Sequence, residues 1–277
     1  MRIKLAVFAT AAISFAVVQS GSAADMPAKI YTKAPMVAPA YSWTGFYVGG
    51  TVGYGWGGQA INLTPDANYA PAFALGAIPG SLAANPRGVF GGLEYGTNWQ
   101  FQRIVLGLES DFSFSDIKRS QTLFNTVNPA GITNQGQQKL DSFSTSRVRV
   151  GYTVQDNLLL YATAGLADGH ATASSSVTTG GGACAIPGGG NCPAGSDSKT
   201  LWGWAAGAGV EYGMGHWSAK LEYLHYDLGH LNYLMTDPTA PGQFIAASTK
   251  FSGDIVRAGV NYRFDWTPLG LLFGNHS

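Results

Sequence analysis

Two histidines and an aspartate in the segment LHYDLGH come closest to a catalytic arrangement. His225 and His230, with Asp227 between them, could supply an imidazole general base and a carboxylate that orients it. No serine or other nucleophile lies in a recognisable motif beside them. We therefore interpret these residues as polar groups near the rim of a strand, and the sequence predicts no enzyme.

The only two cysteines, Cys184 and Cys192, lie close together in the segment CAIPGGGNC. In an exported chain such a pair favours a disulfide that closes a small loop. A metal site would need two more ligands, and no histidine or cysteine cluster adjoins the pair in the sequence. The surrounding glycines lack the Lys-Ser/Thr pair and the helix of a phosphate-binding loop. We therefore expect no metal and no cofactor.

Charged residues are scarce, at 12% of the chain, but several recur at alternate positions of short apolar runs. Their signs nearly balance. The interior of an eight-stranded barrel is only wide enough for side chains to fill, so we expect paired charges that plug its lumen. A narrow ion-conducting gap is the alternative. The predicted lumen charges are Glu94, Glu109, Asp111, Arg147, Arg149, Glu211, Lys220, Glu222, Asp254, Arg257 and Arg263.

The elements that position these charges have the period of β-strands. In the last run, 251–264, Val256, Val260 and Tyr262 alternate with polar or small residues. Alternate side chains of a strand point to opposite faces, so one face is apolar and the other is charged. A soluble sandwich would turn the apolar face inward, whereas an outer-membrane barrel turns it toward lipid.

The spacing of the runs favours the barrel. Long connections, predicted at 57–85, 117–141, 173–199 and 230–249, alternate with short turns, as in outer-membrane barrels. The sequence therefore predicts an all-β fold, an eight-stranded antiparallel up-and-down transmembrane barrel with its short turns in the periplasm. The fifth run begins apolar on both faces, so the pattern alone does not assign its register, although it favours Ala162, Ala164 and Leu166 as outward residues. The runs are 43–56, 88–99, 104–116, 143–152, 158–172, 200–212, 217–228 and 251–264.

The N-terminus reads as a secretory signal. Arg2 and Lys4 precede the apolar run 5–18, and a small-residue cleavage site ends at Ala23, with Ala24 as the alternative. We expect a signal peptide at 1–23, a proline-rich periplasmic lead-in at 24–41, the barrel at 42–264 and a C-terminal extension at 265–277.

Several segments resemble the small porin-family, opacity-like outer-membrane surface proteins of alphaproteobacteria. They are TGFYVGG (44–50), GLESDF (107–112), GAGVEY (207–212), WSAKLEYLHYDLG (217–229) and VRAGVNYRF (256–264). The resemblance implies location in the outer membrane of a Gram-negative bacterium, roles in envelope integrity, surface exposure or limited diffusion, and no enzyme. Family members usually end at the last aromatic of the closing strand, here Phe264. This chain continues with DWTPLGLLFGNHS, which we expect to be an irregular extension or to pack at the barrel mouth.

Two functions follow from this interpretation. The first is a structural and surface-exposed barrel with a plugged lumen, and the second is a small porin for ions or small solutes. The expected partners are outer-membrane lipid, the barrel assembly machinery and an unknown surface ligand of the long loops. The sequence has no basic excess, with 16 basic and 16 acidic residues, and we expect no nucleic-acid partner.

Overall fold

The computed structural model describes residues 41–83, 85–126, 131–180, 184, 186 and 191–264. The predicted signal peptide, the tail 265–277 and the lead-in before Tyr41 lie outside these residues. The described part holds one short helix, α1 (Ala70–Ala74), and ten strands. The strands are β1 (Gly45–Gly57), β2 (Ile61–Pro65), β3 (Ser81–Leu82), β4 (Arg87–Phe101), β5 (Ile104–Asn125), β6 (Ile132–Gln155), β7 (Leu158–Thr179), β8 (Ala194–Met214), β9 (Trp217–Thr236) and β10 (Phe244–Phe264).

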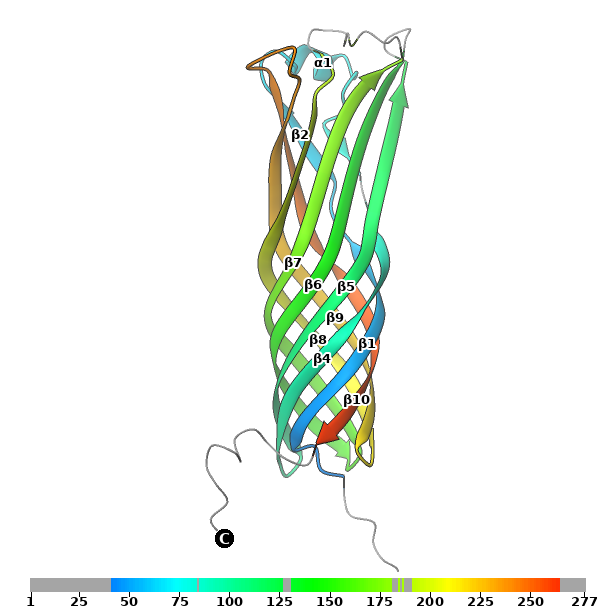
Figure 1. The fold of residues 1–277 in the computed structure, drawn as a ribbon, viewed down its shortest axis with the longest axis vertical. Helices are drawn as coiled ribbons and strands as arrows, with labels where there is room; N and C mark the ends of the chain where they lie inside the picture. The colour runs from blue at the N-terminus through cyan, green and yellow to red at the C-terminus, as the bar shows by residue number, and fades with distance from the viewer. Residues whose placement is uncertain are drawn as a thin grey trace, which may run out of the picture. The chain divides into compact units, whose positions relative to one another are not determined.

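Eight of the strands close into an antiparallel barrel. Each of β4 to β9 pairs with the next strand along the chain, and β1 pairs with both β4 and β10. The closing register places Phe46 opposite Phe264, and Figure 1 shows β1 and β10 side by side. The predicted eight-stranded barrel, with its last strand paired to its first, is confirmed. No helix in the described ranges is long and apolar enough to cross a membrane.

The two ends of the barrel have different connections. At one end, which we call the short-turn end, two residues join the strands at 102–103, 156–157 and 215–216. Gln102 and Gly215 have φ angles of 55° and 62° there, as tight hairpin turns require. At the other end, the long-loop end, the connections are 58–86, 126–131, 180–193 and 237–243. The predicted alternation of long and short connections is confirmed.

In the half of the barrel near the short turns, the outer face is apolar and the lumen is polar. Leu106 and Leu108 are 41% and 52% exposed on β5, whereas Glu109 is 2% exposed. The structure decides the register of the fifth run, in which Ala162 and Ala164 face outward and Tyr161 is buried. This apolar band spans about ten residues of each strand, the length that a tilted strand needs to cross a bilayer.

Toward the long-loop end the pattern reverses, and here the predicted loops were wrong in extent. Residues 117–141, 173–199 and 230–249 are mostly continuations of β5 to β10. In β10, Ile245 and Phe251 are buried inside, while Ser248 and Lys250 lie outside. These stretches therefore extend the sheet and give it a polar outer face. From their composition alone they were predicted to be loops. Register shifts in β9–β10, β5–β6 and β6–β7 accompany the change.

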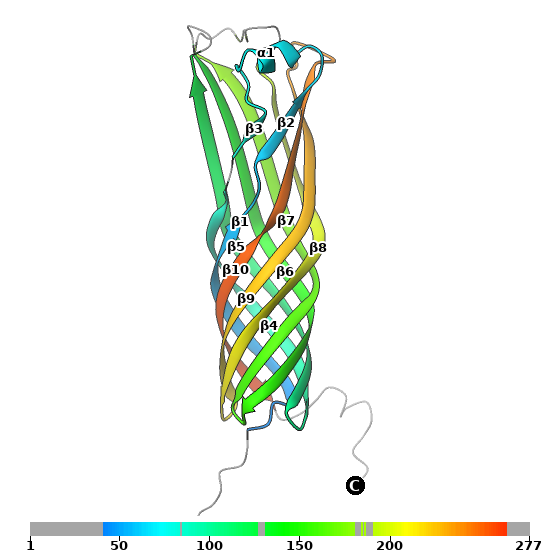
Figure 2. The ribbon, with the colours of Figure 1, turned by 180° about the vertical axis from the view of Figure 1, so that it is seen from behind.

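The first long connection adds two short strands to the wall at this end. After Gly57 the chain continues as β2, which pairs with β10 through Ile245 opposite Pro65, and β3 pairs with β2. Figure 2 shows β2, β3 and α1 at the long-loop end. Their buried side chains join the inward residues of β5 to β10 in one apolar core. Members of this core include Ile61, Leu63, Tyr69, Ile78, Leu82, Ile117, Leu140, Phe143, Tyr226, Met235, Ile245 and Phe251.

Candidate functional site

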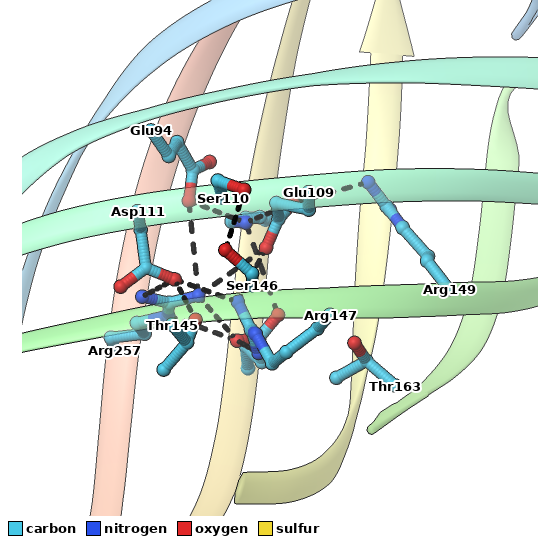
Figure 3. A network of polar contacts seen from close by, with 12 residues as sticks. Glu94, Glu109, Ser110, Asp111, Thr145, Ser146, Arg147, Arg149, Thr163 and Arg257 are labelled. Carbon is cyan, nitrogen blue, oxygen red and sulfur yellow. Dashed lines mark hydrogen bonds and ion pairs between the residues drawn. The ribbon is translucent and has the colours of Figure 1, made fainter. Parts of the chain in front are cut away.

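Nine charged side chains gather in the lumen, in the half of the barrel with the apolar outer face. Strand alternation turns them all inward from β4, β5, β6, β8, β9 and β10. Each is at most 4% exposed, and Figure 3 shows part of the group. The lumen charge cluster comprises Glu94, Glu109, Asp111, Arg147, Arg149, Glu211, Lys220, Glu222 and Arg257.

Arg147 on β6 donates hydrogen bonds to acidic residues of β5 and β9. Its Nη2 donates hydrogen bonds to Glu109 Oε1 at 2.6 Å and to Asp111 Oδ2 at 3.0 Å. Its Nη1 donates to Glu222 Oε1 on β9 at 2.8 Å. Thr145 Oγ1 adds a bond of 2.6 Å to Asp111 Oδ2. Because β6 and β9 are not neighbours in the ring, the contact with Glu222 crosses the barrel interior.

Arg257 and Lys220 extend these contacts from the other side of the barrel. Arg257 Nε donates to Glu222 Oε1 at 2.9 Å, and Arg257 Nη1 lies 3.1 Å from Asp111 Oδ2. Lys220 Nζ lies 2.8 Å from Glu109 Oε2 and 2.6 Å from Glu94 Oε2. The contact with Glu94 is an ion pair of poor hydrogen-bond geometry, since neither oxygen of Glu94 receives a hydrogen bond from a described residue.

A second layer lies nearer the short turns and contains two tyrosines that the sequence analysis left out of the cluster. Arg149 forms an ion pair with Glu211 and lies over the ring of Tyr161, 3.9 Å from its centroid. Tyr161 Oη donates to Glu222 Oε2 at 2.8 Å. Tyr47 Oη donates to Glu109 Oε2, also at 2.8 Å. The two phenols therefore link the layers.

Each of these tyrosines has a glycine directly opposite on the neighbouring strand. Tyr47 pairs with Gly96 and Tyr161 pairs with Gly209. A Cβ at Gly209 would lie 2.5 Å from the Tyr161 ring, and one at Gly96 would lie 2.4 Å from Tyr47 Oη. Such aromatic and glycine cross-strand pairs are a recognised device in barrels. These tyrosine–glycine pairs could have indicated that Tyr47 and Tyr161 belong to the cluster, but the pairs can be recognised only once the register of the strands is known.

Replacing Gly209 with valine is expected to push the Tyr161 ring away from Arg149 and Glu222. Overpacking of this kind costs about 1–3 kcal/mol. Urea unfolding of the refolded barrel measures the loss. The control is Ala208→Val, which adds the same side chain at the neighbouring position on the outer face of β8. An equal loss in both variants would contradict the role of Gly209.

Two predicted lumen charges are not members of this cluster, and one of them lies on the other face of its strand. Asp254 is on the outer face, because it shares the parity of Val256, and it accepts hydrogen bonds from Tyr223 Oη at 2.6 Å and His225 Nδ1 at 2.9 Å. The expectation for Asp254 is therefore corrected. Arg263 lies at the short-turn end, where Nη1 donates to the Thr44 carbonyl at 3.1 Å and the guanidinium lies over the Tyr41 ring. Arg263 lies opposite Tyr47 and therefore on the inward face of β10, as the alternation predicts.

The remaining predicted residues are also placed. Phe264 ends β10, with its ring 5.1 Å from that of Tyr262. A disulfide joins Cys184 and Cys192, whose Cα atoms are 5.5 Å apart. His225 also contacts the Trp204 ring on the outer face, and His230 is exposed. Within the described ranges, no group of three or more metal-ligating side chains is close enough to hold an ion.

Comparison with known proteins places this geometry in a family. The model of the outer membrane protein beta-barrel domain matches residues 10–264. This chain belongs to that family. The 31 kDa outer-membrane immunogenic protein of Brucella melitensis biotype 1 is 34% identical over 261 residues, which is 94% of this chain and 96% of the relative. The 22 kDa outer membrane protein of Rhizobium leguminosarum bv. viciae is 28% identical, over 82% of this chain and 81% of the relative.

Among solved structures, the outer membrane protein OprG from Pseudomonas aeruginosa matches 81% of this chain and 98% of its own, with 10% identity and a TM-score of 0.45. Membership of the outer membrane protein beta-barrel family places the protein in the outer membrane of a Gram-negative bacterium, as the sequence predicts. The apolar band is the face that contacts lipid, and the lumen charge cluster lies at the level of the bilayer.

Proposed function

We propose that this outer-membrane barrel has a structural and surface-exposed role and that its lumen is closed to ions and solutes. The observation that carries the proposal is the set of ion pairs that cross the lumen. Arg147 on β6 and Arg257 on β10 both contact Glu222 on β9 and the acids of β5. The interior of an eight-stranded barrel is only wide enough for side chains to fill, so buried charges with partners on several sides favour a lumen without a continuous column of water.

The apolar core at the long-loop end supports the same proposal, as a second barrier beyond the lumen charge cluster. Toward the long-loop end, the interior holds the apolar core to which β2, β3 and α1 contribute. Ile61, Tyr69 and Ile78 are at most 1% exposed in this core. A hydrated ion would lose its water shell there without gaining a polar ligand, which is strongly unfavourable. A small porin, the alternative function, would need an opening through both barriers.

Planar-bilayer recording on refolded protein tests the proposal. We expect no reproducible single-channel steps above the bare bilayer. Insertion is checked on the same preparation by heat-modifiable gel mobility and by protection of the strands from protease. The absence of channel steps from inserted protein then indicates a closed lumen. Reproducible steps from protein that passes both checks would overturn the closed-lumen proposal and favour the porin.

The proposed orientation has the short turns in the periplasm and the long hairpins outside the cell, as in other outer-membrane barrels. An unknown surface ligand would then meet the long-loop end, and the barrel assembly machinery would act on the protein during insertion. The proposed role is not enzymatic. Lipid or peptide hydrolysis that is lost on replacing His225 or His230 with alanine would contradict this part of the proposal.

A further inference from the structure

One edge of the sheet has no partner strand in the half beyond the apolar band. Within the band β4 lies between β1 and β5, and its pair nearest the long-loop end joins Arg87 to Lys118. Beyond this pair, the chain that leads into Arg87 belongs to β3, which pairs with β2. The strand β5 nevertheless continues to Asn125, so residues 119–124 have β6 on one side and no described strand on the other. We call residues 119–124 the open edge.

A slot of about 470 Å³ separates the open edge from the chain that follows β3. It is lined by Ala83, Asn85, Arg87, Arg119, Ser120, Gln121 and Thr122. The pair of Arg87 with Lys118 closes its end nearest the band. At its other end, Asn125 Nδ2 donates a hydrogen bond to the Ala77 carbonyl at 2.9 Å. Six residues of extended chain lie between these two contacts, a length of about 20 Å.

The open edge offers backbone hydrogen-bonding groups to the slot. In an antiparallel pair, every second residue directs its N–H and C=O toward the partner strand, and the residues between direct theirs away. Because β5 is antiparallel to β6 here, alternate residues of the open edge direct both groups into the slot. Gln121 adds an acceptor, since its Oε1 is shielded from solvent and receives no hydrogen bond from a described residue. An edge of this kind is a template for one further strand.

The side chains of the open edge change from basic to apolar along its length. Arg119, at the end nearest the band, is exposed and forms no ion pair with a described residue. At the far end, Leu123 is 37% exposed on the inward face and Phe124 is 66% exposed on the outward face. An added strand would therefore meet positive charge at one end and exposed apolar groups at the other.

We propose that the open edge binds an extended peptide of another protein as an added antiparallel strand, with apolar residues first in the peptide and acidic residues last. Such a peptide runs toward the membrane, so its first residues pack against Leu123 and Phe124 and its last lie beside Arg119 and Arg87. Opposite charges on neighbouring strands stabilise a sheet. This proposal deepens the surface-exposed role and rests on the proposed orientation, in which this half lies outside the cell.

The open edge is unsuited to a second copy of this chain. Two copies inserted the same way in one membrane run their β5 strands in the same direction, so their open edges cannot pair antiparallel. A parallel arrangement would place Arg119 of each copy at the same level, and opposed like charges destabilise a sheet. An inward-pointing charge on an edge strand is a recognised guard against self-pairing. Arg119 therefore opposes pairing between copies and favours an acidic partner.

The test uses the full-length refolded protein in detergent micelles and a labelled synthetic peptide of two valines, three threonines and two glutamates, in that order. Fluorescence anisotropy measures binding, and hydrogen exchange locates it. We expect saturable binding and slower exchange of amides in residues 119–124. The same peptide with lysines in place of the glutamates is expected to bind roughly tenfold more weakly. A peptide N-methylated on the amides that face β5 is expected not to bind, because it cannot donate to the open edge.

Reversing the charge of Arg119 is expected to reverse the preference. Arg119→Glu should bind the lysine peptide more tightly than the glutamate peptide. Lys199→Glu reverses a charge on β8 at a side chain that is 47% exposed, and this matched control should keep the native preference. If Arg119→Glu fails to fold, Arg119→Gln replaces it and should bind the two peptides equally.

The proposal would be overturned if the glutamate peptide did not bind saturably, or if the N-methylated peptide bound equally well. Equal binding of the glutamate and lysine peptides to the native protein, or the native preference in the Arg119 variant, would also overturn it. The same holds for exchange protection confined to residues outside the open edge. Competition by free glutamate as effective as by unlabelled peptide would show an anion site in place of an added strand. Surface protease digestion of cells tests the orientation separately, since cleavage confined to the short turns would contradict the orientation alone.

Discussion

Replacing Arg147 with methionine is expected to lower the free energy of unfolding of the barrel by about 3–5 kcal/mol. Methionine fills much of the space but leaves Glu109, Asp111 and Glu222 without one of their cations, at sites that are at most 4% exposed. An uncompensated buried charge costs more than the native ion pair contributes. Urea unfolding in detergent micelles or vesicles, followed by tryptophan fluorescence, measures the change.

The control for Arg147 removes a cation that lies at the surface. Lys199 on β8 has a side chain 47% exposed and lies 3.9 Å from Asp197. Lys199→Met is expected to change the free energy of unfolding by no more than about 0.5 kcal/mol. Similar small losses in both variants would show that the lumen charge cluster is hydrated in solution, contrary to the burial described above.

A double variant tests the direct coupling between Arg147 and its acids. Asp111→Asn removes one negative charge and keeps a group that can accept the hydrogen bond from Thr145. Combined with Arg147→Met, it is expected to recover part of the loss, with a coupling energy of about 0.5–3 kcal/mol. Simple additivity of the two single losses would mean that Arg147 acts through packing alone.

Phe143→Ala is expected to cost about 3–5 kcal/mol, because it removes a large side chain from the apolar core of the long-loop half. Phe143 is 2% exposed, and its ring centroid lies 5.1 Å from that of Tyr226. Unfolding midpoints report the global loss. Protease sensitivity of the long hairpins reports whether this half loosens first, as we expect from its position beyond the apolar band.

The matched control for Phe143 is a phenylalanine of the same half that points outward. Phe124 on β5 is 66% exposed. Phe124→Ala is therefore expected to stay within about 0.5 kcal/mol of the native protein. Equal costs for the two variants, or resistance of the hairpins to protease in Phe143→Ala, would contradict a packed core at this end.

The period of two and the order of long and short connections determined the barrel itself. They predicted eight strands, the lipid-facing residues such as Leu106 and Leu108, and the inward position of charges such as Glu109 and Arg147. These properties belong to single strands and single turns. A strand alternates its side chains whatever its neighbours are, so the sequence is enough to separate the two faces.

Other properties needed the whole sheet. The strands continue past the band because their polar residues turn outward around an apolar interior, a reversal that looks like loop composition along one strand. The phenols of Tyr47 and Tyr161 and the contacts of Glu222 depend on which residues meet across the lumen.

The position of Arg87, Lys118 and Lys139 side by side on β4, β5 and β6 likewise depends on register, which pairs residues far apart in the chain. With Asp254 as the exception, the sequence by itself therefore determined which face the side chains occupy within the band, and only the tertiary structure decided which side chains lie together. The physical reason is that alternation is a property of one strand, whereas register, bulges and closure arise from pairing between strands.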